Sequence, residues 1–153
     1  MFRNLLSRLF VDSASPSHLN GQDAELAIAA LLVRLARADD HYGLVERQRI
    51  DQILARRRGL GPGQAVERRS AAEMLEAEAP DTVRFTRAIK DRIALEDRQE
   101  VIVALWQVAY ADGHRSADEE TLVRLVSGLL GVSDRDSGLA RQRALDGLGM
   151  ADE

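Results

Sequence analysis

Two short acidic turns carry the side chains of this sequence that are best suited to chemistry. Asp39 precedes Glu46 by seven residues, and Asp112 precedes Glu119 by the same interval. This spacing places one carboxylate on each side of a short turn, and carboxylate oxygens are ligands that Ca²⁺ and Mg²⁺ prefer. The standard calcium loop, D-x-[DN]-x-[DN]-G, is absent. All four carboxylates are still candidate ligands of a divalent cation.

The same positions also have a purely structural interpretation as helix starts. Ser116 and Glu119 have the spacing of a capping box, in which each side chain accepts a hydrogen bond from a free backbone N–H. Gly43 and Glu46 form a weaker counterpart, because glycine is also accepted at an N-cap. Acidic residues in a first helical turn are in addition stabilised by the helix dipole. Helix capping and cation binding both stay open as explanations of the turns.

The two turns belong to an internal repeat with an offset of 73 residues. Residues 36–41, Ala-Arg-Ala-Asp-Asp-His, are echoed by residues 109–114, Ala-Tyr-Ala-Asp-Gly-His. Each copy has the pattern of a long buried helix, a tight acidic turn and a shorter amphipathic helix. The repeat also includes a pair of histidines, His41 and His114. Exposed histidines in turns are more often incidental than metal ligands. Two copies predict a pseudo-symmetric bundle with two central helices packed together, because a solenoid needs more copies.

Apolar residues at helical spacing predict an all-α single domain, a compact bundle of about seven helices. The predicted helices cover residues 22–39, 44–58, 64–78, 81–93, 97–112, 116–130 and a stretch that begins after residue 134. The helices at 22–39 and 97–112 are the most apolar, so they are placed at the centre and Trp106 is expected to be buried. In the helix at 116–130, four residues are expected to face inward: Leu122, Leu125, Val126 and Leu129. The domain is expected over residues 22–150, between an N-terminal segment at 1–21 and a tail at 151–153.

Composition and the absence of known motifs exclude several classes of function. The 153 residues are 45% hydrophobic and 30% charged, which suits one domain with a core. No cysteine is present, which removes thiol catalysis, zinc–thiolate sites and iron–sulfur clusters. The net charge of −4 argues against a nucleic-acid partner. No phosphate-binding loop or nucleophile motif occurs, so we expect no enzyme.

One local stretch is positively charged, although the net charge of the chain is negative. Residues 47–69 hold seven arginines against Asp51 and Glu67. We interpret this stretch as a solvated helix face in preference to a surface for phosphate or an acidic partner, because almost no aromatic residue is interleaved with the arginines.

The first ten residues also have a helical apolar pattern, interrupted by Arg3 and Arg8. The arginines break any signal-peptide core, so no export signal is expected. We interpret this segment as a short amphipathic helix followed by a loop and packed on the domain, with a weak membrane contact as the alternative. The longest apolar run, residues 26–33, is too short to span a bilayer.

The tract at residues 106–113, W-x-x-A-Y-A-D-G, and residues 84–87, R-F-T-R, carry a resemblance to a known family. With the repeat, they make the chain similar to the TerB family of tellurite-resistance proteins, above all to its stand-alone, single-domain bacterial members. The resemblance covers about residues 24–132 and implies an all-helical fold with internal two-fold similarity. It also implies that the acidic residues of both turns bind a divalent metal. The first copy departs from the family pattern, with Asp40 where glycine is usual.

The resemblance implies one function and one alternative. We expect a non-catalytic, cytoplasmic module that binds a protein partner in a tellurite-resistance-type stress response at the inner membrane face. Calcium or magnesium bound at the turns would modulate binding to this partner. The alternative is a co-chaperone-like accessory domain, because some membrane-linked J-domain proteins carry a TerB-like domain. The His-Pro-Asp motif of a J domain is missing here, so that role needs a separate J-domain partner.

Overall fold

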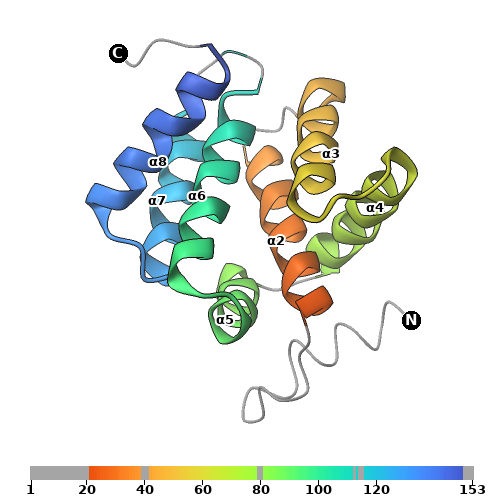
Figure 1. The fold of residues 1–153 in the computed structure, drawn as a ribbon, viewed down its shortest axis with the longest axis horizontal. Coiled ribbons are helices and arrows are strands. Elements are labelled where there is room, and N and C mark those ends of the chain that lie inside the picture. The colour runs from red at the N-terminus through yellow and green to blue at the C-terminus, as the bar shows by residue number, and fades with distance from the viewer. Residues whose placement is uncertain (1–20, 39–41, 79–80, 112, 114–115, 150–153) are drawn as a thin grey trace.

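Seven helices and no strand make up the part of the chain that the computed structural model describes, residues 21–38, 42–78, 81–111, 113 and 116–149. The helices are α2 (Gly21–Ala36), α3 (Leu44–Arg58), α4 (Pro62–Glu78), α5 (Thr82–Arg92), α6 (Leu95–Ala109), α7 (Ala117–Leu129) and α8 (Asp134–Gly147). The all-α prediction is therefore confirmed (Figure 1). None of these described helices is long and apolar enough to cross a membrane. The helix predicted in the first ten residues and the tail at 151–153 lie outside the described residues.

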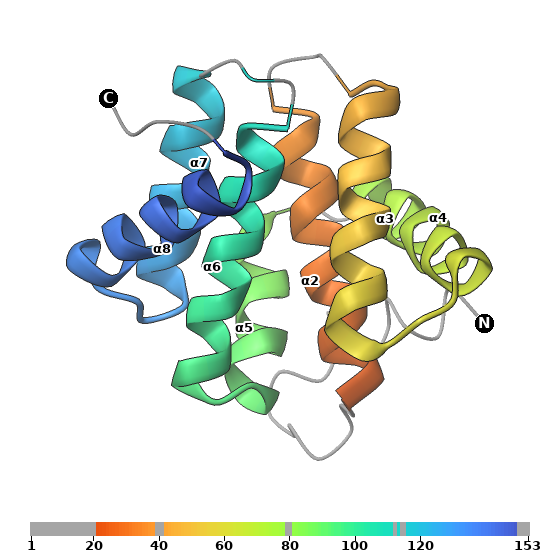
Figure 2. The same cartoon turned by 45° about the horizontal axis from the view of Figure 1, so that its top comes forward.

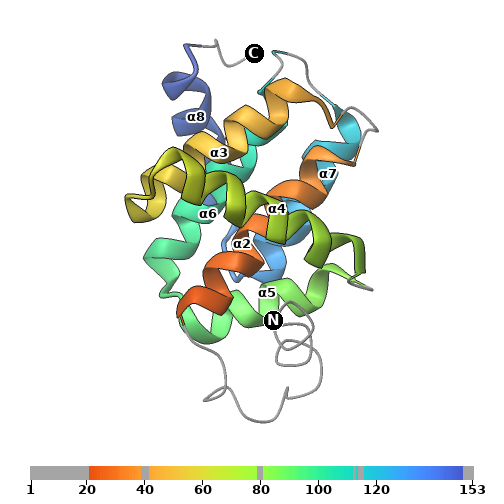
Figure 3. The same ribbon diagram turned by 90° about the vertical axis from the view of Figure 1, so that its right-hand side faces the viewer.

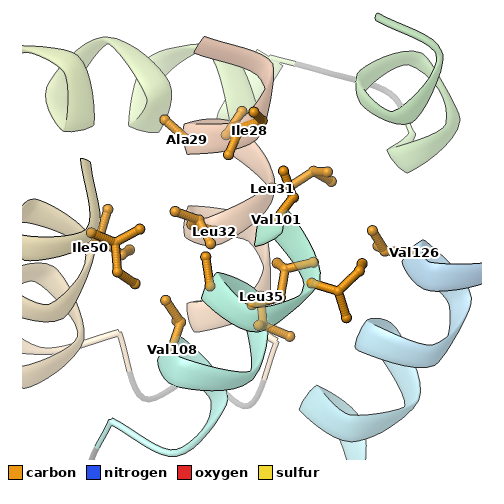
Figure 4. Packing of buried hydrophobic residues seen from close by; sticks show 14 of the residues in the cluster. Ile28, Ala29, Leu31, Leu32, Leu35, Ile50, Val101, Val108 and Val126 are labelled. Carbon is orange, nitrogen blue, oxygen red and sulfur yellow. The ribbon is translucent and has the colours of Figure 1, made fainter. Parts of the chain in front are cut away.

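Helices α2 and α6 lie side by side at the centre of the bundle, as the repeat predicts (Figures 1 and 2). α2 is buried over almost its whole circumference, because apolar residues occupy most of its faces. Leu35 of α2 lies in one core with Val101 and Val108 of α6, and Ile50 of α3 joins it (Figure 4). Trp106 is 2% exposed, so the prediction that it is buried is confirmed.

The other helices cover this central pair. α4 packs against α2 and α3 and crosses the face of α2 (Figure 3). α8 packs mainly against α6, with α7 beside both. α5 lies across one end of the bundle, against α2 and α7. At the opposite end, α2 leads into α3 and α6 leads into α7 (Figure 2).

Both central helices end earlier than predicted. α2 ends at Ala36 instead of residue 39, and α6 covers Leu95–Ala109 instead of 97–112. After α6 the chain reaches Gly113 with a φ of 80°, a conformation in which a side chain would be strained. α4 begins at Pro62 instead of residue 64, because proline at the first helical position loses no hydrogen bond.

The prediction that Leu125 faces inward is wrong, since this side chain is 53% exposed. Val126 is buried as predicted, and Leu122 and Leu129 are partly buried. The buried face of α7 consists of residues at helical spacing: Glu119, Val123, Val126 and Ser127. Leu125 lies away from this face because successive helical residues are turned by about 100°.

Candidate functional site

The helix ends that flank the two acidic turns lie at the same end of the bundle (Figure 2). Two of the four candidate cation ligands, Glu46 and Glu119, belong to the described part of the chain. Asp39 and Asp112 lie outside the described residues, and so do the two turn histidines. The geometry of the turns is therefore built from the two glutamates and the residues around them.

Glu46 is the third residue of α3 and is only 7% exposed. The backbone N–H of Gly43 donates a hydrogen bond to Glu46 Oε1 at 2.8 Å. This is the reach-back contact of a capping box, in which the glutamate satisfies a free N–H at the helix start. The structure thus confirms the capping interpretation of Gly43 and Glu46.

Glu119 is the third residue of α7 and is 5% exposed. The cap here is Ser116, whose Oγ accepts a hydrogen bond from the backbone N–H of Glu119 at 3.3 Å. The predicted N-cap role of Ser116 is therefore confirmed. Both copies of the repeat bury a glutamate at the same position of the helix that follows the turn.

The cation site itself stays a prediction. Within the described residues, no three aspartate, glutamate or histidine side chains are grouped so that they could hold a metal ion. The predicted donors are carboxylates alone, a set that suits Ca²⁺ or Mg²⁺ and not a soft metal. A carboxylate has two oxygens, so Glu46 can cap α3 through Oε1 and still present an oxygen lone pair to a cation.

The first turn is tied to α4 through Tyr42. The Tyr42 hydroxyl donates a hydrogen bond to Glu73 Oε2, and Arg69 Nη1 lies 3.0 Å from the same oxygen. The guanidinium groups of Arg37 and Arg47 lie over the Tyr42 ring, each 5.1 Å from its centre. Burial and the contact with Glu73 raise the pKa of Tyr42 well above its ordinary value, so the hydroxyl stays a proton donor.

The second turn is tied to α8 through Tyr110. Its ring stacks on that of Trp106, one helical turn earlier, with the ring centres 5.8 Å apart. Its hydroxyl donates a hydrogen bond to Glu120 Oε2 at 3.0 Å and accepts one from Arg141 Nε at 2.8 Å. Trp106 Nε1 donates to the backbone carbonyl of Ser137 at 3.1 Å. The W-x-x-A-Y tract therefore joins α6 to α7 and α8.

The contacts that anchor the two turns were not predicted from the sequence. The spacing of Trp106 and Tyr110 by four residues was a usable signal for a stacked pair on one helix face. Glu73 and Arg141, by contrast, lie 31 residues from the tyrosines that they bind. No local spacing could have revealed those contacts.

The basic stretch at residues 47–69 is only partly a solvated face. Arg57 binds Glu25 of α2 through two hydrogen bonds of 2.9 Å, and Arg58 binds the same carboxylate at 3.1 Å. Arg69 of α4 pairs with Asp51 of α3 at 2.6 Å. The expectation of a solvated face is therefore wrong for Arg57 and Arg69, which are largely buried and connect helices, whereas Arg58 contacts Glu25 with half of its side chain exposed.

The helical fold, the repeated turns and the W-x-x-A-Y-A-D-G tract can now be compared with known protein families. The family model described as Tellurite resistance protein TerB matches residues 25–142 of the chain. The chain belongs to the TerB family. No curated protein and no solved structure matches it. The TerB match begins in α2 and ends in α8, so both acidic turns and both tyrosine anchors lie within the TerB domain.

Proposed function

We propose that this TerB domain is a non-catalytic module that binds a protein partner in a tellurite-resistance-type stress response. In this proposal it acts in the cytoplasm, at complexes on the inner membrane face, and Ca²⁺ or Mg²⁺ tunes its binding. The proposed ligands are the four carboxylates of the turns, Asp39, Glu46, Asp112 and Glu119. The observation that carries the proposal is the duplication of a buried glutamate at the third position of α3 and α7.

Burial of Glu46 and Glu119 favours a binding role, because removing a carboxylate from water costs free energy that must be offset. Glu46 receives the N–H of Gly43 at 2.8 Å, and its place at a helix start adds the favourable helix dipole. An ionised carboxylate can accept about four hydrogen bonds in all. A hard cation is a fitting partner for the remaining lone pairs of such a group.

The surroundings of the first turn favour a protein partner. Leu44 and Val45, the first two residues of α3, are 69% and 48% exposed. Adjacent exposed apolar side chains are typical of contact surfaces between proteins. They lie immediately before Glu46, so a cation bound by Glu46 would lie next to the surface that a partner meets.

Thermal unfolding in increasing Ca²⁺ or Mg²⁺ tests the cation. A ligand bound only by the folded state stabilises it by about 2.7 kcal/mol at a hundred times its Kd, so the Tm should rise with concentration. Asp112→Asn combined with Glu119→Gln should abolish the rise and keep the helical circular dichroism. Asp39→Asn combined with Glu46→Gln should have a smaller effect, because Asp40 replaces the glycine of the family pattern in the first turn.

Two control variants separate cation binding from capping and from net charge. Ser116→Ala should lower stability by about 1 kcal/mol through loss of the N-cap, with the metal-dependent rise unchanged. Glu78→Gln combined with Asp91→Asn removes two exposed carboxylates elsewhere and should also leave the rise intact. Identical wild-type melting curves in Ca²⁺, Mg²⁺ and chelator would refute the cation site and leave capping as the whole explanation. Partner binding is tested separately, by co-purification with and without chelator.

A further inference from the structure

A groove of about 400 Å³ lies between α3 and α6, apart from the acidic turns. The two helices run antiparallel on either side of α2, so the end of α3 lies level with the start of α6 (Figure 2). The apolar side chains of the groove, such as Ile53 and Val103, are almost completely buried. A ligand in the groove therefore meets mainly charged side chains: Arg56, Arg57 and Arg58 of α3, and Asp97 and Glu100 of α6.

Three of these five charges are already paired within the domain. Arg57 binds Glu25 of α2 through two hydrogen bonds of 2.9 Å, and Arg58 binds the same carboxylate at 3.1 Å. Glu100 is bound by Arg143 of α8 through two contacts of 2.7 and 3.0 Å. These ion pairs connect the walls of the groove to the rest of the domain and satisfy the charges that take part in them.

Arg56 and Asp97 are the two remaining charges of the lining. Both side chains are exposed, and neither forms a hydrogen bond or an ion pair with another described residue. The hydrogen bonds to Glu25 raise the pKa of Arg57, and the charges of Asp97 and Glu100 raise it further, so Asp97 lies close to the arginines at the end of α3. The groove thus presents one unpaired positive group and one unpaired negative group on facing helices.

We infer that this groove binds a small zwitterion, a dipeptide with free amino and carboxyl groups. The carboxylate of the dipeptide contacts the guanidinium of Arg56, whose planar set of donors suits a carboxylate. The ammonium group contacts the carboxylate of Asp97 on the facing helix. The inference goes beyond the proposed function, because it concerns a small ligand and neither a protein partner nor a cation.

The charges and the size of the groove favour this ligand over simpler ones. An anion attracted by Arg56 also meets the carboxylates of Asp97 and Glu100, and a cation attracted by Asp97 meets three arginines. A ligand that carries both charges avoids either repulsion. The ends of an extended dipeptide are about 7 Å apart, which lets its two charges face opposite walls. The volume also lies near the lower end of the range of about 300–1,000 Å³ for small-ligand pockets.

The test uses the full chain and three forms of alanyl-alanine, in a buffer that contains chelator. The free dipeptide has both charges, the acetylated form keeps only the carboxylate, and the amidated form keeps only the ammonium group. Amide chemical shifts, followed at constant ionic strength, give the Kd and locate the site. We expect the free dipeptide to bind with a Kd of about 1 mM and to shift the resonances of residues 53–58 and 97–104. Both blocked forms should bind about tenfold more weakly.

Variants of the chain assign each charge of the ligand to its partner. Arg56→Gln should weaken the free dipeptide by about tenfold and leave the amidated form unchanged, because that form has no carboxylate to lose contact. Asp97→Asn should weaken the free dipeptide equally and leave the acetylated form unchanged. Both side chains are exposed, so the circular dichroism of the variants should equal that of the wild type. The matched control is Arg87→Gln combined with Asp91→Asn, which removes one exposed charge of each sign from α5 and should leave every Kd unchanged.

Three results would overturn the inference. The first is the absence of shifts at the groove at dipeptide concentrations far above the expected Kd. The second is equally tight binding of a blocked form, since one of the two charges would then not be recognised. The third is an equal loss of affinity in the α5 control, which would spread the attraction over the whole surface. Because the titrations contain chelator, none of these results bears on the cation proposed for the turns.

Discussion

Replacement of Glu25 by glutamine should destabilise the domain more than the loss of an exposed ion pair does. Glu25 is 2% exposed, and its carboxylate accepts two hydrogen bonds from Arg57 and one from Arg58. Glutamine keeps the shape and one carbonyl acceptor but removes the negative charge. The Arg57 side chain, 18% exposed, would then hold a positive charge without its counter-ion.

The size of the effect follows from the burial of the three side chains. Removing one partner of a fully buried ion pair costs about 3–5 kcal/mol, whereas an exposed pair contributes about 0–1 kcal/mol. The Glu25 side chain is 3% exposed and that of Arg58 is 50% exposed, so this cluster lies between the two limits. We expect Glu25→Gln to lower the free energy of unfolding by about 2–3 kcal/mol.

The effect should also depend on pH in a defined direction. Burial alone would raise the pKa of Glu25, but the hydrogen bonds and charges of Arg57 and Arg58 outweigh burial and lower it below its ordinary value. Because the folded-state pKa is the lower one, the stabilisation is complete above the unfolded-state pKa and is lost as the pH falls through the folded-state pKa. The difference between wild type and Glu25→Gln should therefore be constant near neutral pH and disappear in acid.

Urea titrations followed by circular dichroism, at neutral pH and at successive acid steps, measure this difference. The matched control is Glu100→Gln, which breaks a two-contact pair with Arg143 whose side chains are 49% and 57% exposed. That variant should lose less than about 1 kcal/mol. Equal losses for the two variants, or a difference that persists unchanged into acid, would refute the reasoning.

Two further stability predictions concern a core ring and a helix cap. Trp106→Ala should lower the free energy of unfolding by about 3–5 kcal/mol in urea titrations, because the ring is 2% exposed. A loss below about 1 kcal/mol would contradict its place in the core. Asp81→Ala should cost about 1 kcal/mol in the same assay, because Asp81 Oδ1 accepts a hydrogen bond from the backbone N–H of Arg84 at 3.1 Å. An unchanged urea midpoint would show that this cap does not stabilise α5.

Helices were predictable from the sequence wherever local chemistry sets their limits. The predicted helix at 44–58 coincides with α3, because Gly43 and Glu46 cap its start and Gly59 ends it with a φ of 62°. The ends of α2 and α6 were not predictable, since apolar residues continue past the point where the chain turns. The error at Leu125 has a similar cause. Two overlapping stripes of α7 fit helical spacing, and only packing against the neighbouring helices selects Val123 over Leu125.

In the candidate site, too, the local contacts were predictable from the sequence and the tertiary contacts were not. The roles of Glu46 and Glu119 at helix starts follow from capping patterns within four residues, so the sequence could predict them. The clusters that hold the turns, at Tyr42 and at Tyr110, use partners from α4 and α8. Such contacts arise from tertiary packing and leave no local pattern in one sequence.

The arrangement of α4 and α8 extends the repeat beyond the two turns. Adding the 73-residue offset to Pro62–Glu78 gives residues 135–151, which overlap α8 at Asp134–Gly147. α4 packs chiefly on α2, as α8 packs chiefly on α6. Each half of the domain is therefore three helices, α2–α4 and α6–α8, and α5 connects the halves.

In each three-helix unit, residues beside the turn contact the third helix, although the residues that make the contact differ between the two halves. Position 37 corresponds to position 110, and Arg37 reaches α4 through Glu76, whereas Tyr110 reaches α8 through Arg141. In the first half Arg37 and Tyr42 contact Glu76 and Glu73 of α4, and in the second half Tyr110 contacts Arg141 of α8, so polar contacts join the residues beside each turn to the third helix of the same half. Capping alone needs only the helix that follows the turn. These added contacts connect the residues beside each turn to the third helix of the same half, so a cation bound at the proposed turn sites would act on α4 or α8 as well as on α3 or α7.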